Sequence, residues 1–137
     1  MTPILLDTCA TIWLAEGAPI SRVAQQALLE AAERNQPIFI SPITAWEIGL
    51  LVSKERLKLS VDPQVWFDRL GANSKIRITE LSGRILIASS FLPGSPPKDP
   101  ADRIVAATAR ENGFRLMTRD RPLLKYAEDG HVSALAC

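Results

Sequence analysis

The sequence has few of the residues on which several common protein classes depend. It contains two cysteines, Cys9 and Cys137, in no CxxC or CxxH spacing, and one histidine, His131. These counts argue against a disulfide framework and a zinc site, and they fit a reducing compartment. No apolar run approaches the roughly 20 residues of a membrane span, and the first residues lack the basic and apolar segments of a signal peptide. We therefore expect a cytoplasmic protein without a membrane partner.

An excess of charge of either sign is also missing. The 16 lysines and arginines nearly balance the 15 aspartates and glutamates, so no global positive field indicates nucleic-acid binding. A local basic stretch of Arg115, Arg119, Arg121 and Lys125 could guide phosphates, but it fits a solvated face equally well. A glycine-rich phosphate loop is absent too, which disfavours nucleotide hydrolases of the P-loop kind.

What the sequence does contain is typical of a packed α/β protein. Its 137 residues are 47% hydrophobic and show no repeat or linker, so we expect one domain over residues 1–137. Apolar patterning and capping residues predict strands at 4–6, 38–40, 76–78, 114–117 and 132–135, and helices at 8–16, 21–35, 41–53, 65–70, 82–91, 99–112 and 121–127. Short strands alternating with helices predict a three-layer α/β/α sandwich with a central parallel sheet.

Two aspartates follow predicted strands, and a third lies in the first turn of a predicted helix. Asp7 follows the first strand, Asp120 lies just past the strand at 114–117, and Asp102 lies in the first turn of the helix that leads into that strand. Functional groups of parallel sheets collect outside the carboxyl ends of the strands, so Asp7 and Asp120 share one edge if their strands are adjacent. Each acid also has a structural interpretation. Asp7 and Asp99 suit helix N-caps, Asp102 suits the positive end of a helix, and Asp120 suits a turn.

Glu47 is notable because it interrupts an apolar helical face. That face is predicted to contain Ile43, Trp46, Leu50 and Leu51. A carboxylate on a packed face needs a cation, hydrogen bonds or a metal, because burying it alone costs several kcal/mol. The same patterning predicts all three tryptophans, Trp13, Trp46 and Trp66, as core side chains and not as platforms for RNA bases.

Carboxylates without clustered histidine or cysteine suit Mg²⁺ or Mn²⁺, and the chemistry that such ions commonly support is phosphodiester hydrolysis. A thiol nucleophile at Cys9 is disfavoured because His131 has no evident acid to orient it. A phosphatase resembling haloacid dehalogenases would need a second aspartate where Cys9 stands.

Four blocks of the sequence resemble the successive motifs of PIN-domain toxins of the VapC type. They are residues 5–8 (LLDT), 41–48 (SPITAWEI), 98–109 (KDPADRIVAATA) and 116–121 (LMTRDR), and they come in the expected order. Relatives of this branch often carry a polar residue such as histidine at Cys9, a histidine at Lys98 and a bulky apolar residue at Ala101. None of these differences removes an acid.

The resemblance implies an α/β/α fold with an acidic pocket that holds Mg²⁺ or Mn²⁺ and cuts RNA, leaving a 3′-hydroxyl and a 5′-phosphate. Asp7, Glu47, Asp102 and Asp120 match the catalytic, metal-binding acids of the family. Thr118 matches its hydroxyl residue, while Asp99 and Arg119 are further candidates to support the site. The resemblance also implies a type II toxin–antitoxin module with a small VapB-type antitoxin, and a homodimer or a toxin–antitoxin hetero-oligomer. The alternative is an inactive PIN-like module that binds RNA or protein, although retention of all four acids argues against it.

Overall fold

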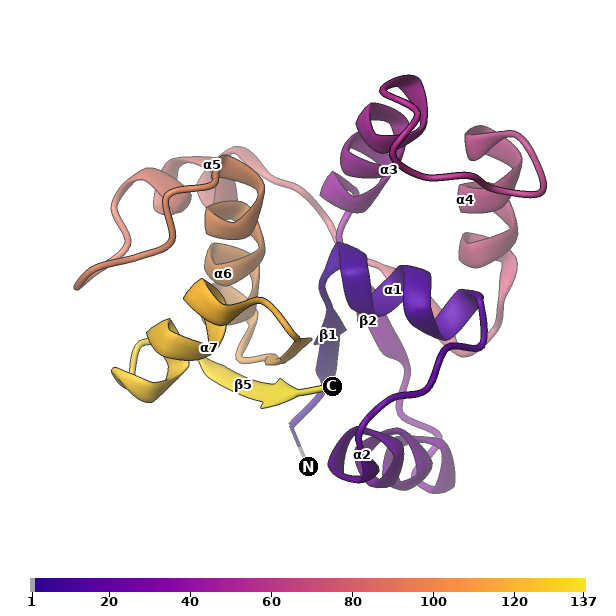
Figure 1. The fold of residues 1–137 in the computed structure, drawn as a ribbon. Coiled ribbons are helices and arrows are strands. Elements are labelled where there is room, and N and C mark those ends of the chain that lie inside the picture. Colours follow the sequence, from indigo (N-terminus) through magenta and orange to yellow (C-terminus); the bar gives the residue numbers. More distant parts are fainter. Residues whose placement is uncertain (1) are drawn as a thin grey trace.

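The computed structural model describes residues 2–137 and contains a five-stranded parallel sheet (Figure 1). The strand order is β3-β2-β1-β4-β5, so the first strand lies in the middle. The strands are β1 (Ile4–Leu6), β2 (Ile38–Ile40), β3 (Ile76–Ile78), β4 (Arg115–Thr118) and β5 (Ser133–Ala136). Each has only three or four residues, and β1 is completely buried, as expected for a central parallel strand covered on both faces.

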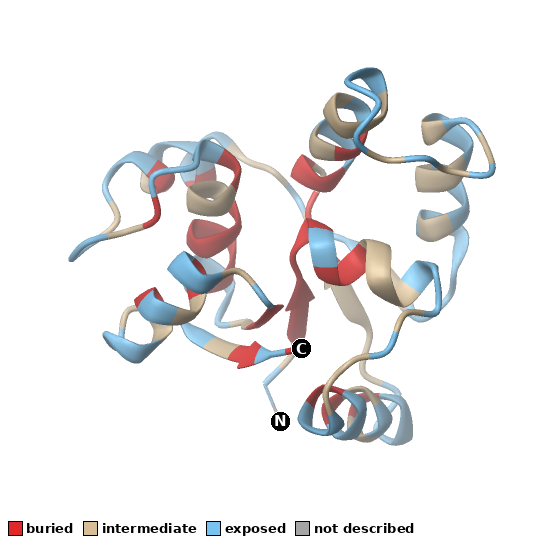
Figure 2. Cartoon of the chain, viewed as in Figure 1, coloured by how far each residue is buried: buried red, intermediate tan, exposed pale blue. Residues whose placement is uncertain are grey.

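Seven helices connect and cover these strands. They are α1 (Thr8–Ala15), α2 (Arg22–Glu33), α3 (Ile43–Ser53), α4 (Pro63–Ala72), α5 (Gly83–Ser90), α6 (Pro100–Asn112) and α7 (Arg121–Glu128). Figure 2 shows buried residues along β1 and on α6, whereas α4 contains only exposed and half-buried residues. None of the helices formed by residues 2–137 is long and apolar enough to cross a membrane.

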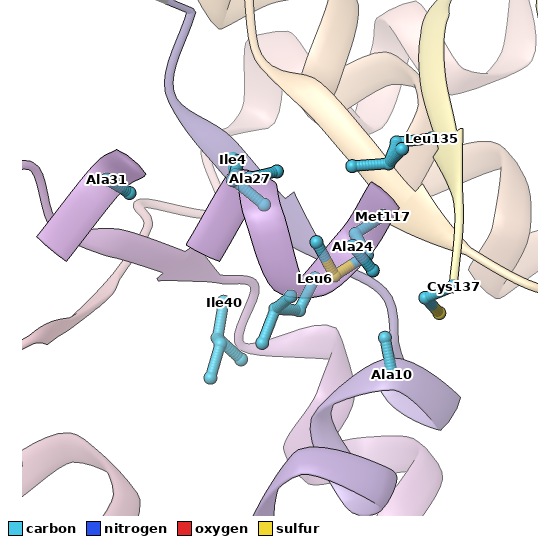
Figure 3. Packing of buried hydrophobic residues seen from close by; sticks show 10 residues of the cluster. All are labelled: Ile4, Leu6, Ala10, Ala24, Ala27, Ala31, Ile40, Met117, Leu135 and Cys137. Carbon is cyan, nitrogen blue, oxygen red and sulfur yellow. The ribbon is translucent and has the colours of Figure 1, made fainter. Parts of the chain in front are cut away.

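The core has one layer on each face of the sheet because successive strand residues point to opposite sides. On one face, Ile4 and Leu6 of β1 pack against Ala24 and Ala27 of α2, together with further residues of the cluster in Figure 3. On the other face, Leu5 packs in a cluster that α6 and α7 supply with small and apolar side chains. This arrangement confirms the predicted α/β/α sandwich.

Most predicted boundaries differ from the structure by one or two residues. The strand predicted at 114–117 is displaced by one position, which makes Thr118 the last residue of β4. The prediction that Ser41 caps α3 with Pro42 inside the helix is wrong by one residue. Pro42 occupies the N-cap position and cannot cap by a side-chain hydrogen bond, while the Ser41 hydroxyl accepts a bond from the Ile43 amide.

Gly94 illustrates how the proline-rich loop at residues 92–98 is held against the carboxyl-terminal region. Its φ is +69°, and a Cβ at this position would overlap the ring of His131. That ring packs on Tyr126 at 5.0 Å between centroids, and the Tyr126 hydroxyl donates a hydrogen bond to the carbonyl oxygen of Pro93 at 2.5 Å. The loop therefore depends on a residue without a side chain at this position.

Substitution of Gly94 by alanine is expected to lower the free energy of unfolding by about 2 kcal/mol. Part of this is the cost of a left-handed backbone, and the rest is displacement of His131. Gly113→Ala is the matched control, since Gly113 has φ +68° with open space around its Cα, and it should cost only about 1 kcal/mol. Urea unfolding of both variants measures the difference, and equal losses would show that the His131 contact contributes nothing.

Candidate active site

The carboxyl ends of β1 and β4 lie next to each other. Leu6 pairs with Met117, and the amide of Asp7 donates to the carbonyl oxygen of Met117 at 3.2 Å. The assumption that these two strands are adjacent is therefore confirmed. It brings Asp7, at the end of β1, beside Thr118 and Asp120 at the end of β4.

Asp7 is both a helix cap and a buried acid. Its Oδ1 accepts a hydrogen bond from the Ala10 amide at 2.8 Å and so caps α1, while its Oδ2 accepts one from the Thr118 hydroxyl. The residue is only 5% exposed. Burial raises the pKa of the carboxyl above its ordinary value, the bonds from Thr118 and Ala10 lower it, and the nearby Asp120 raises it further.

Asp120 lies directly beyond Thr118 and also caps a helix. Its Oδ2 accepts from the Leu123 amide at 3.0 Å at the start of α7. Its own amide donates to the Thr118 hydroxyl oxygen at 2.9 Å. Thr118, which is fully buried, thus donates to Asp7 and accepts from Asp120, so this one hydroxyl connects the ends of both strands.

Glu47 lies on α3, half-buried. Its hydrogen-bond partner is the Thr8 hydroxyl, which donates to Glu47 Oε1 at 2.5 Å, and not the positively charged side chain that a carboxylate on a packed face would favour. The two ion pairs within residues 2–137 are elsewhere, at Arg84–Glu111 and Lys125–Asp129. Burial raises the pKa of Glu47, the Thr8 bond lowers it, and Asp99, Asp7 and Asp120 raise it.

The face of α3 differs from the predicted one. Its buried residues are Ile43, Thr44 and Ile48, whereas Trp46 is 55% exposed. The prediction that Trp46 is a core residue is therefore wrong, because the helix is turned so that Thr44 takes the inward position. Trp13 and Trp66 are half-buried.

Asp99 and Asp102 occupy the first turn of α6. Asp99 is exposed and caps the helix, with its Oδ2 accepting from the Asp102 amide at 3.0 Å, in agreement with the structural interpretation of Asp99. The pKa of Asp102 is raised to about 7. Burial is the largest cause, and the charges of Asp120, Asp99, Glu47 and Asp7 follow in that order.

The four predicted acids are therefore electrostatic neighbours without a neutralising cation. The pKa of Asp102 is raised by each of the other three, and no basic side chain offsets the effect. As the side chains stand, no three acidic, histidine or cysteine residues within residues 2–137 converge closely enough to hold a metal ion. The structure brings the carboxylates to one edge of the sheet but leaves their oxygens apart, which is the arrangement that mutual repulsion favours.

Cys9 also lies in this negative environment. The residue as a whole is exposed, but partial burial of its thiol, followed by the charges of Asp7, Glu47, Asp102 and Asp120, raises the pKa to about 11. A thiolate is thus strongly disfavoured, which agrees with the rejection of a thiol nucleophile.

Arg119 contacts α1 and the segment that follows it. Its guanidinium lies 3.9 Å from the ring centroid of Trp13, and Nη2 donates to the carbonyl oxygen of Pro19 at 2.7 Å. These contacts brace the segment between α1 and α2, and Arg119 is not among the groups that shift the pKa of Asp7, Glu47 or Asp102.

Two residues near the acids were missed from sequence. The sequence places Thr8 at the start of a helix and in the block at 5–8, and Arg103 in the block at 98–109, but it predicts no contact for either side chain. Arg103 donates from Nε to the Ser89 carbonyl at 2.9 Å and from Nη1 to the Pro97 carbonyl at 3.3 Å. It thereby fastens the end of α5 to the loop before Asp99, and no local signal shows that its partners are carbonyls of that loop.

The family model described as "PIN domain" matches residues 4–129, nearly the whole chain. The chain belongs to the PIN domain family. This PIN domain is 36% identical to Ribonuclease VapC22 of Mycobacterium tuberculosis over 124 residues, which are 90% of this chain and 91% of that protein.

Solved structures share the fold of this PIN domain. The crystal structure of VapBC2 from Rickettsia felis, bound to a DNA fragment from its promoter, superposes with a TM-score of 0.67 at 19% identity and covers 97% of both chains. A toxin-antitoxin complex from Klebsiella pneumoniae superposes with a TM-score of 0.55 at 28% identity, covering 85% of this chain and 86% of the other.

Proposed function

We propose that this chain is a metal-dependent endoribonuclease, a single PIN domain over residues 1–137, and the toxin of a type II toxin–antitoxin module. The observation that carries the proposal is the group of four coupled carboxylates, Asp7, Glu47, Asp102 and Asp120, without a basic partner. An isolated protein gains nothing from holding such charges together, whereas a bound cation would remove the repulsion. The similarity to Ribonuclease VapC22 supports RNA as the substrate.

The residues present fit a hard divalent ion such as Mg²⁺ or Mn²⁺. All candidate ligands are carboxylate oxygens, and the raised pKa values of Asp7, Glu47 and Asp102 show how unfavourable their unneutralised charges are. Asp7, Glu47 and Asp102 would hold the ion, with Asp120 completing the pocket. The bound metal would supply Lewis acidity and a water of lowered pKa for phosphodiester hydrolysis.

Hydrogen bonds within the chain orient the carboxylates of Asp7 and Asp120. The Thr118 hydroxyl orients Asp7 and spaces it from Asp120 through the two bonds described above. Capping bonds at Asp7 and Asp120 fix one oxygen of each carboxylate, and each oxygen retains a lone pair for a ligand. Asp99 adds negative charge at the rim, where it would attract a cation.

An antitoxin partner is the second element of the proposal. The solved relatives from Rickettsia felis and Klebsiella pneumoniae are described as toxin–antitoxin assemblies. On this chain, Ile87 and Phe91 are 65% and 80% exposed, and apolar surface of this kind is commonly covered by a partner chain. We propose a VapB-type antitoxin and a homodimer or toxin–antitoxin hetero-oligomer in the cell.

The test is cleavage of single-stranded RNA by the purified chain with Mn²⁺ or Mg²⁺ and with EDTA. We expect cleavage only with the divalent ion, and products with 5′-phosphate ends. RNA binding without cleavage under every metal condition would instead support an inactive binding module. Cleavage that persists in EDTA would contradict the metal-dependent proposal.

A further inference from the structure

Thr8 is placed to control the position of Glu47. It is the first residue of α1, is only 5% exposed, and donates its hydroxyl hydrogen to Glu47 Oε1 across 39 residues of sequence. The same hydroxyl lies 3.2 Å from the Thr44 hydroxyl, which is fully buried on α3. Three side chains from two helices therefore form one connected network beside the acidic group.

The direction of this network follows from counting hydrogens. A threonine hydroxyl has one hydrogen, and that of Thr8 is used on Glu47. The Thr8–Thr44 contact therefore has Thr44 as its donor and Thr8 as its acceptor. Donation from Thr44 to Thr8 polarises the Thr8 hydroxyl and strengthens its bond to the glutamate.

The network also connects Glu47 to the turn that contains Asp7. Thr8 follows Asp7 directly, and the Asp7 amide is tied to β4 through the Met117 carbonyl. Glu47 is thus attached to the same turn that holds Asp7, and only one of its oxygens is used. Within residues 2–137 no protein group bonds to Glu47 Oε2, so this oxygen is free to bind an ion.

We propose that Thr8, supported by Thr44, is a positioning residue that holds Glu47 Oε1 and leaves Oε2 available to a divalent cation shared with Asp7. The inference rests on the proposed function and deepens it. Without the Thr8 hydroxyl, Glu47 has several rotamers to order on binding, and the affinity for the ion falls. Outer hydrogen-bond partners of metal ligands typically contribute roughly 10- to 100-fold in affinity.

The experiment measures Mn²⁺ binding by calorimetry in the purified full chain, without RNA. Thr8→Val, which keeps the shape and removes the hydroxyl, should weaken Mn²⁺ binding roughly 10- to 100-fold. Thr8→Ser should retain affinity within about threefold. Thr44→Val removes only the supporting donor, so we expect a smaller loss. Thr108→Val is the matched control, because Thr108 is also buried on a helix but its hydroxyl donates to the Ile104 carbonyl and not to an acid.

A double-mutant cycle with Glu47→Gln separates positioning from general damage. If Thr8 acts through Glu47, Thr8→Val should change Mn²⁺ affinity by less than about threefold in the Glu47→Gln background. An undiminished effect there, or wild-type affinity in Thr8→Val, would overturn the inference. If a urea titration shows that Thr8→Val does not fold, Thr44→Val and Thr8→Ser test the inference instead. A loss of Mn²⁺ affinity in Thr8→Ser as large as that in Glu47→Gln would also overturn it.

Different results would overturn the proposed nuclease function and the proposed role of Thr8. A wild-type chain that binds Mn²⁺ but cleaves no RNA would overturn the nuclease proposal and leave the Thr8 experiment valid. A wild-type chain that binds no Mn²⁺ overturns both. Wild-type binding and cleavage combined with an unaffected Thr8→Val variant overturns only the role of Thr8.

Discussion

Replacing Asp7 with asparagine is expected to reduce RNA cleavage on the order of a thousandfold while the chain still folds. Asparagine keeps an Oδ1 that can accept from the Ala10 amide, so the cap of α1 survives. It loses the charge that a divalent ion needs, and its amide group faces Thr118, whose hydroxyl can rotate and accept. Initial rates with a labelled RNA measure the effect, and far-ultraviolet circular dichroism checks folding.

The stability of this variant gives a second, independent readout. The pKa of Asp7 is raised in the folded state, so the ionised carboxylate opposes folding at neutral pH. Without metal, Asp7→Asn should therefore unfold at the same or a higher urea concentration than the parent. Asp68→Asn is the control, because Asp68 is an exposed acid on α4 that bonds to the Gln64 side chain, and it should alter neither property. Parent-level cleavage by a folded Asp7→Asn chain would refute the role of Asp7.

The part of the site that could be predicted from sequence is the part fixed by neighbouring residues. Asp7 and Asp120 each follow a short apolar strand, and any parallel sheet with those strands side by side places both at one edge. The N-cap assignments of Asp7 and Asp99 also follow from local chemistry, and the structure shows both. For Asp7 the capping bond uses Oδ1 and the bond from Thr118 uses Oδ2, so the cap leaves room for the proposed role of this carboxylate.

The other features of the site depend on which face of each helix packs inward and on contacts between residues that are distant in sequence. Periodicity predicts Glu47 and Trp46 on one apolar face, but α3 packs with Thr44 inward and Trp46 outward. The buried Thr44 hydroxyl contacts Thr8 of α1, a residue 36 positions away, and periodicity within one helix does not reveal such a partner. The Thr8–Glu47 bond spans 39 residues and the Arg119–Trp13 contact spans more. Such pairs leave no local pattern in a single sequence.

Without metal, the protein should become less stable as the pH rises from about 4 to about 7. The reason is Asp102, whose pKa is raised from 3.8 to about 7 by burial and by Asp120, Asp99, Glu47 and Asp7. Between these values the folded chain holds a proton that the unfolded chain has released, so folding is favoured at the lower pH and this contribution is lost as the pH passes through about 7. Because Asp102 is only partly buried, solvent screens part of this effect, and we expect a moderate fall in the free energy of unfolding over this range.

Urea titrations in EDTA from about pH 5 to about pH 8 measure this dependence. Asp102→Asn should flatten it, whereas Asp68→Asn should leave it unchanged. Added Mn²⁺ should raise the stability of the parent most at the high-pH end, because the cation replaces the proton as the partner of the carboxylates. A stability that rises steadily with pH in EDTA would show that the acids are not repelling one another in the folded chain, and the electrostatic reason for placing a metal among them would be lost.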